Sequence, residues 1–221
     1  MIANVLTGEE RDEAEGVIRK NHYTHSVPSG KSHYIRFGSA IVVWSIPANK
    51  NLGRFILPLW NCKAWELSRL WAPDKHEPNL LTQAISAAIA ELQSLEQGVD
   101  ILVSYADPNA GHKGGVYRAA SWVYHGKSEE VRAYLKDGQC VARRKFHSGK
   151  RGMTKKEIEA LGFIELRLPG KERFVKPVSR RARKFYRDAA RSEIALVERR
   201  KLADQNLREA LDLLKADKEQ P

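Results

Sequence analysis

The chain has 221 residues, of which 42% are apolar and 29% charged, and this is enough for one substantial hydrophobic core. It has no run of about 18 apolar residues, which excludes a membrane-spanning helix, and the charged residues after Thr7 predict that the start is not a signal peptide. Cys62 and Cys140 form no CxxC motif, which argues against a zinc knuckle and fits a reducing cytoplasm.

The positive charge is concentrated in one part of the chain. The formal net charge is +11, and the segment from Arg143 to Arg187 alone has 16 Lys and Arg residues against 4 Asp and Glu residues, a balance of +12. A near-neutral body with a basic arm favours a polyanionic partner, above all nucleic acid, over a merely solubilising surface. A membrane surface is disfavoured because the block has no apolar helix face. The side chains expected to contact nucleic acid are Lys31, Arg143, Arg144, Lys145, Lys150, Arg151, Arg180, Arg181, Arg183 and Lys184.

The first two thirds of the chain alternate between predicted helices and strands. Apolar residues at helical spacing predict a helix over 8–21, with Thr7 and Glu10 as a capping box. A polar loop follows over 21–30, and then a hairpin of strands 33–37 and 40–46. The further elements, in chain order, are a strand over 65–71, a helix from Pro78 to about Glu96, a strand over 101–106, a helix over 113–121 and a strand over 122–125. This order predicts an α/β fold, with a mixed, mostly antiparallel central sheet flanked by helices.

The C-terminal third is more charged. It predicts a short helix over 154–161, a hairpin over 164–175 with Pro169 and Gly170 at its tip, and a long charged helix from Ser179. The thin apolar stripe of that helix would pack on the body or on a second copy, as a homodimer. We expect three parts: a catalytic core (1–140), a basic extension that completes or flanks it (141–178), and the long helix (179–221).

Polar residues at the ends of two predicted strands mark the candidate site. Ser104 and Tyr105 lead into Asp107 and a Pro/Gly turn, and Glu66, Ser68 and Arg69 interrupt an otherwise apolar strand. Ligand crevices of open α/β sheets lie beyond the carboxyl ends of strands. Buried Glu and Arg are costly unless paired, so a structural ion pair is the alternative for Glu66 and Arg69.

Three further features are each open to a plainer interpretation. Tyr117 has a hydroxyl suited to proton donation, although a tyrosine on a helix is more often a core residue. The glycines around His112 suit close approach of backbone to a ligand, but they do not form a P-loop. His22 and His25 form an HxxH pair without an evident third ligand, so no metal is predicted. Together with Tyr23 and Ser26, they fit a substrate-binding loop or a polar surface loop.

Four motifs in order resemble the Mom family of phage DNA-modification proteins. They cover about residues 15 to 125 and are HYTHSVPSGK from His22, ELSRLW from Glu66, SYAD from Ser104, and the stretch from Gly111 to Tyr117. The resemblance implies a fold similar to the GCN5-related N-acyltransferases. It also implies conversion of adenine in double-stranded DNA to N6-carbamoylmethyladenine, which protects phage DNA from restriction in the host cytoplasm.

The residues that match functional positions of that family are Arg69, Asp107 and Tyr117, together with His22 and Tyr23. One stretch departs from the acyltransferases. Residues 72–79, where those enzymes hold the pyrophosphate of coenzyme A with a glycine loop, have no glycine and contain two prolines and two acids. This argues against the usual acyl-CoA site.

These observations give a hypothesis for the roles in catalysis. Asp107 accepts a proton from N6 of a flipped adenine, Arg69 polarises the donor's carbonyl, and Tyr117 protonates the leaving group. Ser68 is a further catalytic candidate. The substrate-binding candidates are His22, Tyr23, His25, Ser26, Glu66, Ser104, Tyr105 and His112. The expected donor is a glycyl ester such as glycyl-tRNA, because the product has the skeleton of glycinamide, or else acetyl-CoA.

Two other classes of function remain open. An N-acyltransferase acting on a protein or a small-molecule amine would bind CoA tightly and need no DNA. A non-catalytic DNA-binding accessory protein would keep its effect after Asp107→Ala or Tyr117→Phe.

Overall fold

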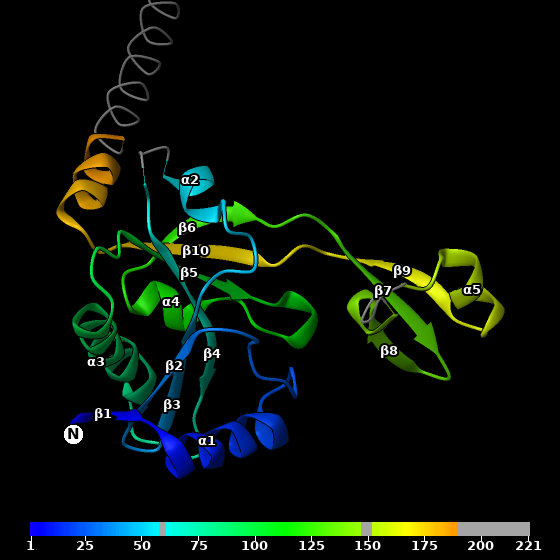
Figure 1. The fold of residues 1–221 in the computed structure, drawn as a ribbon, viewed down its shortest axis with the longest axis horizontal. Coiled ribbons are helices and arrows are strands. Elements are labelled where there is room, and N and C mark those ends of the chain that lie inside the picture. The colour runs from blue at the N-terminus through cyan, green and yellow to red at the C-terminus, as the bar shows by residue number, and fades with distance from the viewer. Residues whose placement is uncertain (58–60, 147–151, 190–221) are drawn as a thin grey trace, which may run out of the picture. The chain divides into compact units, whose positions relative to one another are not determined.

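The structure is a computed structural model that describes residues 1–57, 61–146 and 152–189, and of residues 142–144 the backbone only. The chain divides into two compact units, Met1–Lys176 and Pro177–Pro221. The first unit contains a seven-stranded sheet with its helices and a separate three-stranded sheet (Figure 1). In the second unit, residues 180–189 are helical. No helix among the described residues is long and apolar enough to cross a membrane.

The N-terminal elements follow the sequence pattern closely. They are β1 (Ala3–Leu6), α1 (Gly8–Asn21), β2 (Ser32–Phe37) and β3 (Ala40–Ser45). The expected first helix and the antiparallel hairpin of β2 and β3 are confirmed. The expected capping box is wrong, because the Thr7 side chain makes no capping hydrogen bond.

The middle of the chain has the predicted elements, with shifted ends, and one further helix, α2. They are α2 (Leu52–Ile56), β4 (Ala64–Trp71), α3 (Leu80–Leu95), β5 (Ile101–Ala106), the 3₁₀ turn Pro108–Ala110, α4 (Gly115–Ala119) and β6 (Val123–Lys127). Helix α3 begins two residues later than expected, because Asn79 adopts a left-handed conformation with φ of 62°. The sequence analysis missed β1 and α2.

The large sheet has the order β1-β2-β3-β4-β5-β10-β6, with β10 over Glu172–Pro177. Strands β4 and β5 pair in parallel, whereas β1–β2, β2–β3, β3–β4 and β6–β10 are antiparallel. Helix α3 covers one face, where Trp44 Nε1 donates to the Ala88 carbonyl (3.1 Å). Helix α1 packs on Tyr34 and Val43 of the other face. The expected α/β fold with a mostly antiparallel sheet flanked by helices is confirmed.

The two parallel strands pair over only part of their length. Pairing runs from Ala64 opposite Ile101 to Leu67 opposite Ser104, and β4 then continues unpaired on this side to Trp71. On its other side, β4 has a bulge: Leu67 lies opposite Trp44 and Arg69 opposite Val43, so Ser68 is the extra residue. The sheet therefore opens beyond Leu67, and the bulge sets the direction of Arg69.

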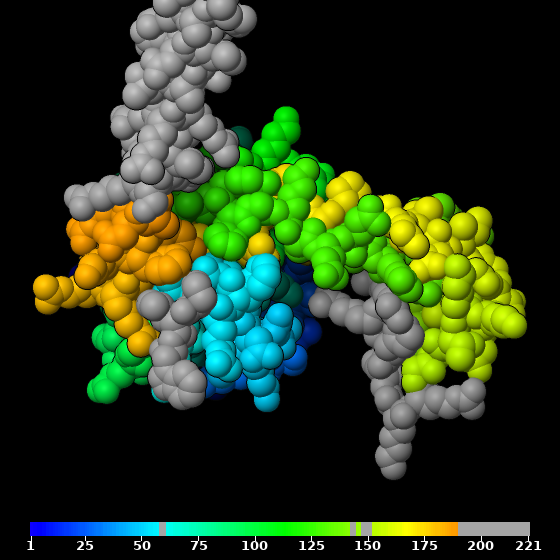
Figure 2. Space-filling model, turned by 90° about the horizontal axis from the view of Figure 1, so that it is seen from above, coloured from blue at the N-terminus to red at the C-terminus, as the bar shows by residue number. Residues whose placement is uncertain are grey.

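A second sheet is inserted between two strands of the first. Residues 129–170, which we call the inserted segment, contain β7 (Val131–Lys136), β8 (Gln139–Ala142), α5 (Lys155–Ala160) and β9 (Ile164–Leu168), with strand order β8-β7-β9. They form a group of their own in Figures 1 and 2. The short helix α5 is confirmed, and the Thr154–Glu157 capping box begins it. The boundary expected after residue 140 falls inside β8.

The hairpin expected over 164–175 is wrong. Strand β9 pairs with β7 of the second sheet, and β10 belongs to the first sheet. Pro169 and Gly170 mark the passage between the two sheets rather than the tip of a hairpin. Most of the segment expected to form the long C-terminal helix, including the apolar stripe from Ile194 onward, lies outside the described residues, and the homodimer expectation lies there with it.

Candidate active site

A cavity of about 500 Å³ lies where β4 and β5 separate. Its volume is typical of small-molecule sites. The candidate site residues that line it are His22, Tyr23, Ser68, Arg69, Tyr105, His112 and Tyr117. They come from the end of α1, from β4, from the end of β5 and from the loop into α4, so residues distant in sequence meet at one opening of the sheet.

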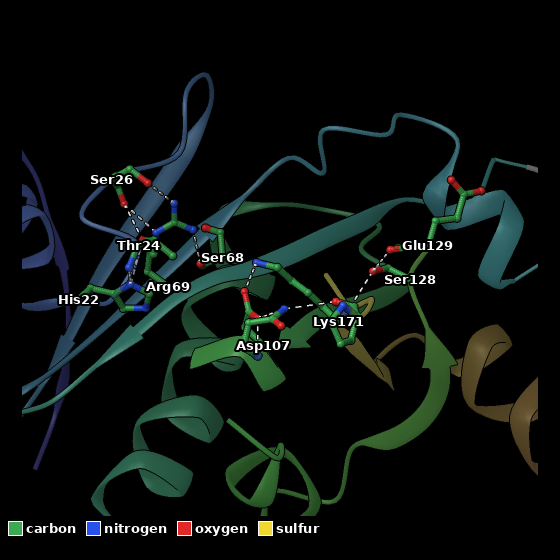
Figure 3. Close-up of polar contacts among 11 residues, drawn as sticks. His22, Thr24, Ser26, Ser68, Arg69, Asp107, Ser128, Glu129 and Lys171 are labelled. Atoms are coloured by element: carbon green, nitrogen blue, oxygen red, sulfur yellow. Dashed lines mark hydrogen bonds and ion pairs between the residues drawn. The ribbon is translucent and has the colours of Figure 1, made fainter. Parts of the chain in front are cut away.

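Arg69 ties the loop after α1 to the bulge of β4 (Figure 3). Its Nε donates to the Ser26 carbonyl (2.7 Å), its Nη2 to Ser26 Oγ (3.1 Å) and its Nη1 to the Ser68 carbonyl (2.5 Å). Ser68 Oγ in turn donates to the Val43 carbonyl (3.1 Å). The guanidinium is thus held at a fixed place in the cavity wall, with Ser26 and Ser68 as its supports. The charge of Arg69 also acts on Glu66, where it opposes the rise in the pKa of that carboxyl.

Three aromatic rings form one wall of the cavity. The Tyr23 ring lies 4.5 Å from the His22 ring and 4.8 Å from the His112 ring, measured between centroids. Burial raises the pKa of Tyr23, and the nearby Asp107 carboxylate raises it further. Flat, partly polar rings of this kind suit a planar heterocycle that stacks and accepts or donates hydrogen bonds.

His22 is buried and neutral. Burial, followed by the charge of Arg69, lowers the pKa of His22 to about 4. Its Nδ1 lies 2.9 Å from Thr24 Oγ1 and 3.2 Å from the Thr24 backbone nitrogen, so Thr24 holds this side of the ring. The imidazole therefore offers the cavity wall a neutral ring at physiological pH.

The pKa of His22 predicts a pH-dependent part of the stability. Between pH 6.5 and 4 the unfolded chain binds a proton at His22 that the folded chain excludes, so the free energy of unfolding falls as the pH falls. In the wild type, His22 should make the free energy of unfolding about 2 kcal/mol lower at pH 5 than at pH 7.5. We expect His22→Asn, whose Oδ1 can still accept from Thr24 N–H, to lack this decrease. Urea unfolding at both pH values measures this, with His76→Asn at an exposed histidine as control. Equal pH dependence of both variants would contradict it.

Tyr117 joins the cavity lining to a hydrogen-bonded chain through Ser104. Its hydroxyl lies 2.8 Å from Ser104 Oγ, which lies 2.8 Å from the Leu67 carbonyl oxygen. Ser104 has one proton, so either it donates to Leu67 and accepts from Tyr117, or it donates to Tyr117 and leaves the phenol proton for a ligand. Burial raises the pKa of Tyr117 to about 12 against the opposing hydrogen bond of Ser104, so the phenol stays protonated.

Asp107 directly follows β5 and the lining residue Ala106, so it lies at the rim of the cavity and is not itself a lining residue. Its Oδ2 pairs with Lys171 Nζ (2.9 Å), and its Oδ1 accepts from Asn109 N (3.0 Å) and Asn109 Nδ2 (3.1 Å). Burial alone would raise the pKa of Asp107, but the hydrogen bond and charge of Lys171, with Asn109, lower it. The carboxylate is therefore ionised, and it has about four acceptor positions, of which these contacts use three. Sequence reasoning missed Lys171.

The structure places other candidates outside the cavity lining. Burial raises the pKa of Glu66, while Arg69 and Lys171 oppose the rise. His25 is turned to the Arg19 carbonyl, with 3.1 Å between its Nδ1 and that oxygen. Ser26 and Ser104 stand behind the lining, as described above.

Of the expected nucleic-acid contacts, Lys31 borders a second cavity of about 330 Å³ and pairs with Glu96. Lys150 and Arg151 lie outside the described residues, as do the side chains of Arg143 and Arg144, while Lys145 belongs to the 3₁₀ turn Arg143–Phe146. The other four are in the second unit. They are Arg180, Arg181, Arg183 and Lys184.

Gly114 fits the cavity loop closely against the core. It has φ of +73°, and a Cβ at this position would lie 2.3 Å from the Phe174 ring, whose centroid is 5.2 Å from that of Tyr117. We expect Gly114→Ala to lower the free energy of unfolding by about 2–4 kcal/mol, from left-handed strain and overpacking. Gly115→Ala is the matched control, because its added Cβ meets nothing within 4 Å. Thermal unfolding compares them, and equal midpoints would contradict the close contact.

A protein-family comparison matches this chain. The model of the Mom protein family covers residues 6–193. The chain belongs to the Mom protein family. A curated relative of this family member is methylcarbamoylase mom of Escherichia phage Mu, 29% identical over 147 residues, which are 63% of this chain. The match spans 60% of that relative's length. The resemblance inferred from the four motifs is thereby confirmed.

Solved structures similar to this Mom family member are acetyltransferases. A Bacillus subtilis acetyltransferase in complex with CoA is 8% identical, with a TM-score of 0.45, and covers 80% of this chain and 99% of its own. An agmatine N-acetyltransferase in its apo form is 9% identical, with a TM-score of 0.44, over the same shares.

A pyrophosphate cradle for coenzyme A does not fit the segment that follows β4 here. Between Trp71 and Leu80 there is no glycine, Pro73 and Pro78 lack N–H donors, and Asp74 lines the cavity as an acid. Among the described residues, no group of three His, Cys, Asp or Glu side chains is placed to hold a metal ion.

Proposed function

We propose that this Mom family member is a transferase that modifies the exocyclic N6 of adenine in double-stranded DNA, giving N6-carbamoylmethyladenine and protecting phage DNA from restriction. The observation that supports this most is the cavity between β4 and β5. It combines a wall of three contacting rings, His22, Tyr23 and His112, with an ionised carboxylate at its rim and a protonated phenol in its lining. A planar base can pack against such a wall once it is flipped out of the duplex.

Asp107 takes the role of proton acceptor. The lone pair of N6 is delocalised into the purine ring, so N6 is a poor nucleophile until an N–H bond begins to transfer its proton. A carboxylate with a lowered pKa is a weak base, but the N6 proton becomes strongly acidic as the new bond to nitrogen forms. An ionised Asp107 therefore suffices to accept it at that stage.

Arg69 and Tyr117 act on the donor, at its carbonyl oxygen and at its leaving group. Arg69 is held by Ser26 and Ser68 and presents positive charge where the donor's carbonyl oxygen becomes negative. Tyr117 donates its proton to the leaving group when Ser104 turns its own proton from the Leu67 carbonyl to the phenol oxygen. The basic residues between Arg143 and Arg187 would hold the DNA backbone without reading its sequence.

The product suggests the donor. A glycyl ester acylates N6, which releases the alcohol of the ester and leaves an N6-glycyl group. The free amine then attacks C6, the bond between C6 and the original N6 breaks, and that nitrogen takes a proton as the terminal amide. The result is N6-carbamoylmethyladenine with all atoms accounted for. Glycyl-tRNA is an ester of this class. The rival donor, acetyl-CoA, needs an added nitrogen.

Mass spectrometry of nuclease-digested DNA from cells that express the chain tests the proposal. We expect modified adenine that contains label from ¹³C-glycine. Modified adenine labelled from acetate instead would replace the glycyl donor by acetyl-CoA. Unmodified DNA in the presence of soluble protein would overturn the proposed function, and acylation of a protein or small amine without DNA would favour the N-acyltransferase alternative.

A further inference from the structure

The two ends of the inserted segment are joined directly beside Asp107. The Ser128 backbone N–H donates to the Lys171 carbonyl (2.8 Å), and the Lys171 backbone N–H donates to Ser128 Oγ (2.9 Å). The backbone of Gly170 lies so close to Ser128 that a Cβ at position 170 would be 1.9 Å from the Ser128 carbonyl oxygen. The backbone of Lys171 is therefore fixed at the root of the inserted segment.

The same root contacts the turn that contains Asp107 (Figure 3). Asn109 Nδ2 donates both to Asp107 Oδ1 (3.1 Å) and to the Pro169 carbonyl (3.3 Å), and Lys171 Nζ lies 2.9 Å from Asp107 Oδ2. The exposed fraction of the side chain is 14% for Asp107 and 33% for Lys171. Both oxygens of the carboxylate are thus fixed by groups at or next to the root.

We propose that Lys171 is a positioning residue, which holds the Asp107 carboxylate in place at the rim of the cavity from the root of the inserted segment. The inference rests on the proposed function only for the role of Asp107, because the contact itself is independent of the reaction. Lys171 has a second effect: its charge opposes protonation of Asp107, so without it the carboxyl would gain its proton at higher pH.

Carboxyl-carbon NMR of the full chain labelled with ¹³C at aspartate measures this contact without any substrate, and Asp107→Asn assigns the signal. We expect the pH midpoint of the Asp107 carboxyl titration to rise by about one pH unit in Lys171→Met. It should return towards the wild-type value in Lys171→Arg, which restores a cation. Lys127→Met is the control, because Lys127 is a nearby exposed cation paired with Glu172. If Lys171→Met loses its folded spectrum, Lys171→Gln takes its place.

The reaction gives the second readout. The amount of modified adenine is measured in lysates of expressing cells that are supplied with DNA at a series of pH values. The acid limb of this pH profile, where modification falls as the pH falls, should move to higher pH in Lys171→Met and back in Lys171→Arg. An unchanged midpoint and an unchanged acid limb in Lys171→Met would overturn the inference. Unmodified DNA from the wild-type chain, together with a shifted NMR midpoint, would overturn the proposed function and leave the contact between Lys171 and Asp107 established.

Discussion

Replacing Asp107 with Asn is expected to lower adenine modification by about 100-fold or more. The substitution keeps an oxygen that can accept from Asn109, but it removes the negative charge and the basic oxygen that takes the N6 proton. Loss of the partly exposed pair with Lys171 should cost only about 1 kcal/mol in stability. The fraction of modified adenine in digested DNA, compared at equal amounts of soluble protein, measures the effect.

Asp137→Asn is the matched control for this prediction. Asp137 lies at the turn between β7 and β8 with φ of 50°, a conformation that asparagine also adopts readily. It should modify DNA as the wild type does. Modification by Asp107→Asn within a few-fold of this control would rule out Asp107 as the proton acceptor.

Replacing Tyr117 with Phe should also reduce modification by about 100-fold or more, because phenylalanine has no proton to donate to the leaving group. The ring keeps its contact with Phe174, and Ser104 still has the Leu67 carbonyl as an acceptor. The loss of stability should therefore be only about 1 kcal/mol. Single-turnover modification, followed by mass spectrometry, separates this defect in chemistry from weaker DNA binding.

Tyr134→Phe removes a hydroxyl in β7 of the second sheet, outside the cavity lining, and should leave modification unchanged. The accessory-protein alternative predicts equal modification by Tyr117→Phe and Tyr134→Phe. A strong loss in Tyr117→Phe alone is the result expected of an enzyme.

The core of the site could be predicted because its signals are local. Asp107 follows the six-residue, mostly apolar strand Ile101–Ala106 and enters a Pro/Gly turn, and Arg69 lies in a strand whose polarity is unusual for a buried element. The cavity itself could not be predicted in the same way. It depends on where β4 and β5 stop pairing and on the bulge at Ser68, and both follow from contacts between residues far apart in the chain.

The role of Lys171 could not be predicted from the sequence for the same reason. It is 64 positions from Asp107 in the sequence and follows Pro169 and Gly170, which are typical of a hairpin tip. Nothing local distinguishes such a tip from a passage between two sheets. Strands β7 and β8, which were also not predicted, are different, because Asp137 and Gly138 form a standard hairpin turn between segments that contain alternating apolar residues, a signal that was available in the sequence.

The closure at Ser128 and Lys171 makes residues 129–170 a replaceable part. For the large sheet, everything between those two residues amounts to one long loop between β6 and β10, so its length and sequence are under little constraint from the core. A different insertion between Ser128 and Lys171 should therefore leave the large sheet and the contact between Lys171 and Asp107 in place. Such an insertion must keep a glycine at position 170, because a Cβ there would lie 1.9 Å from the Ser128 carbonyl oxygen.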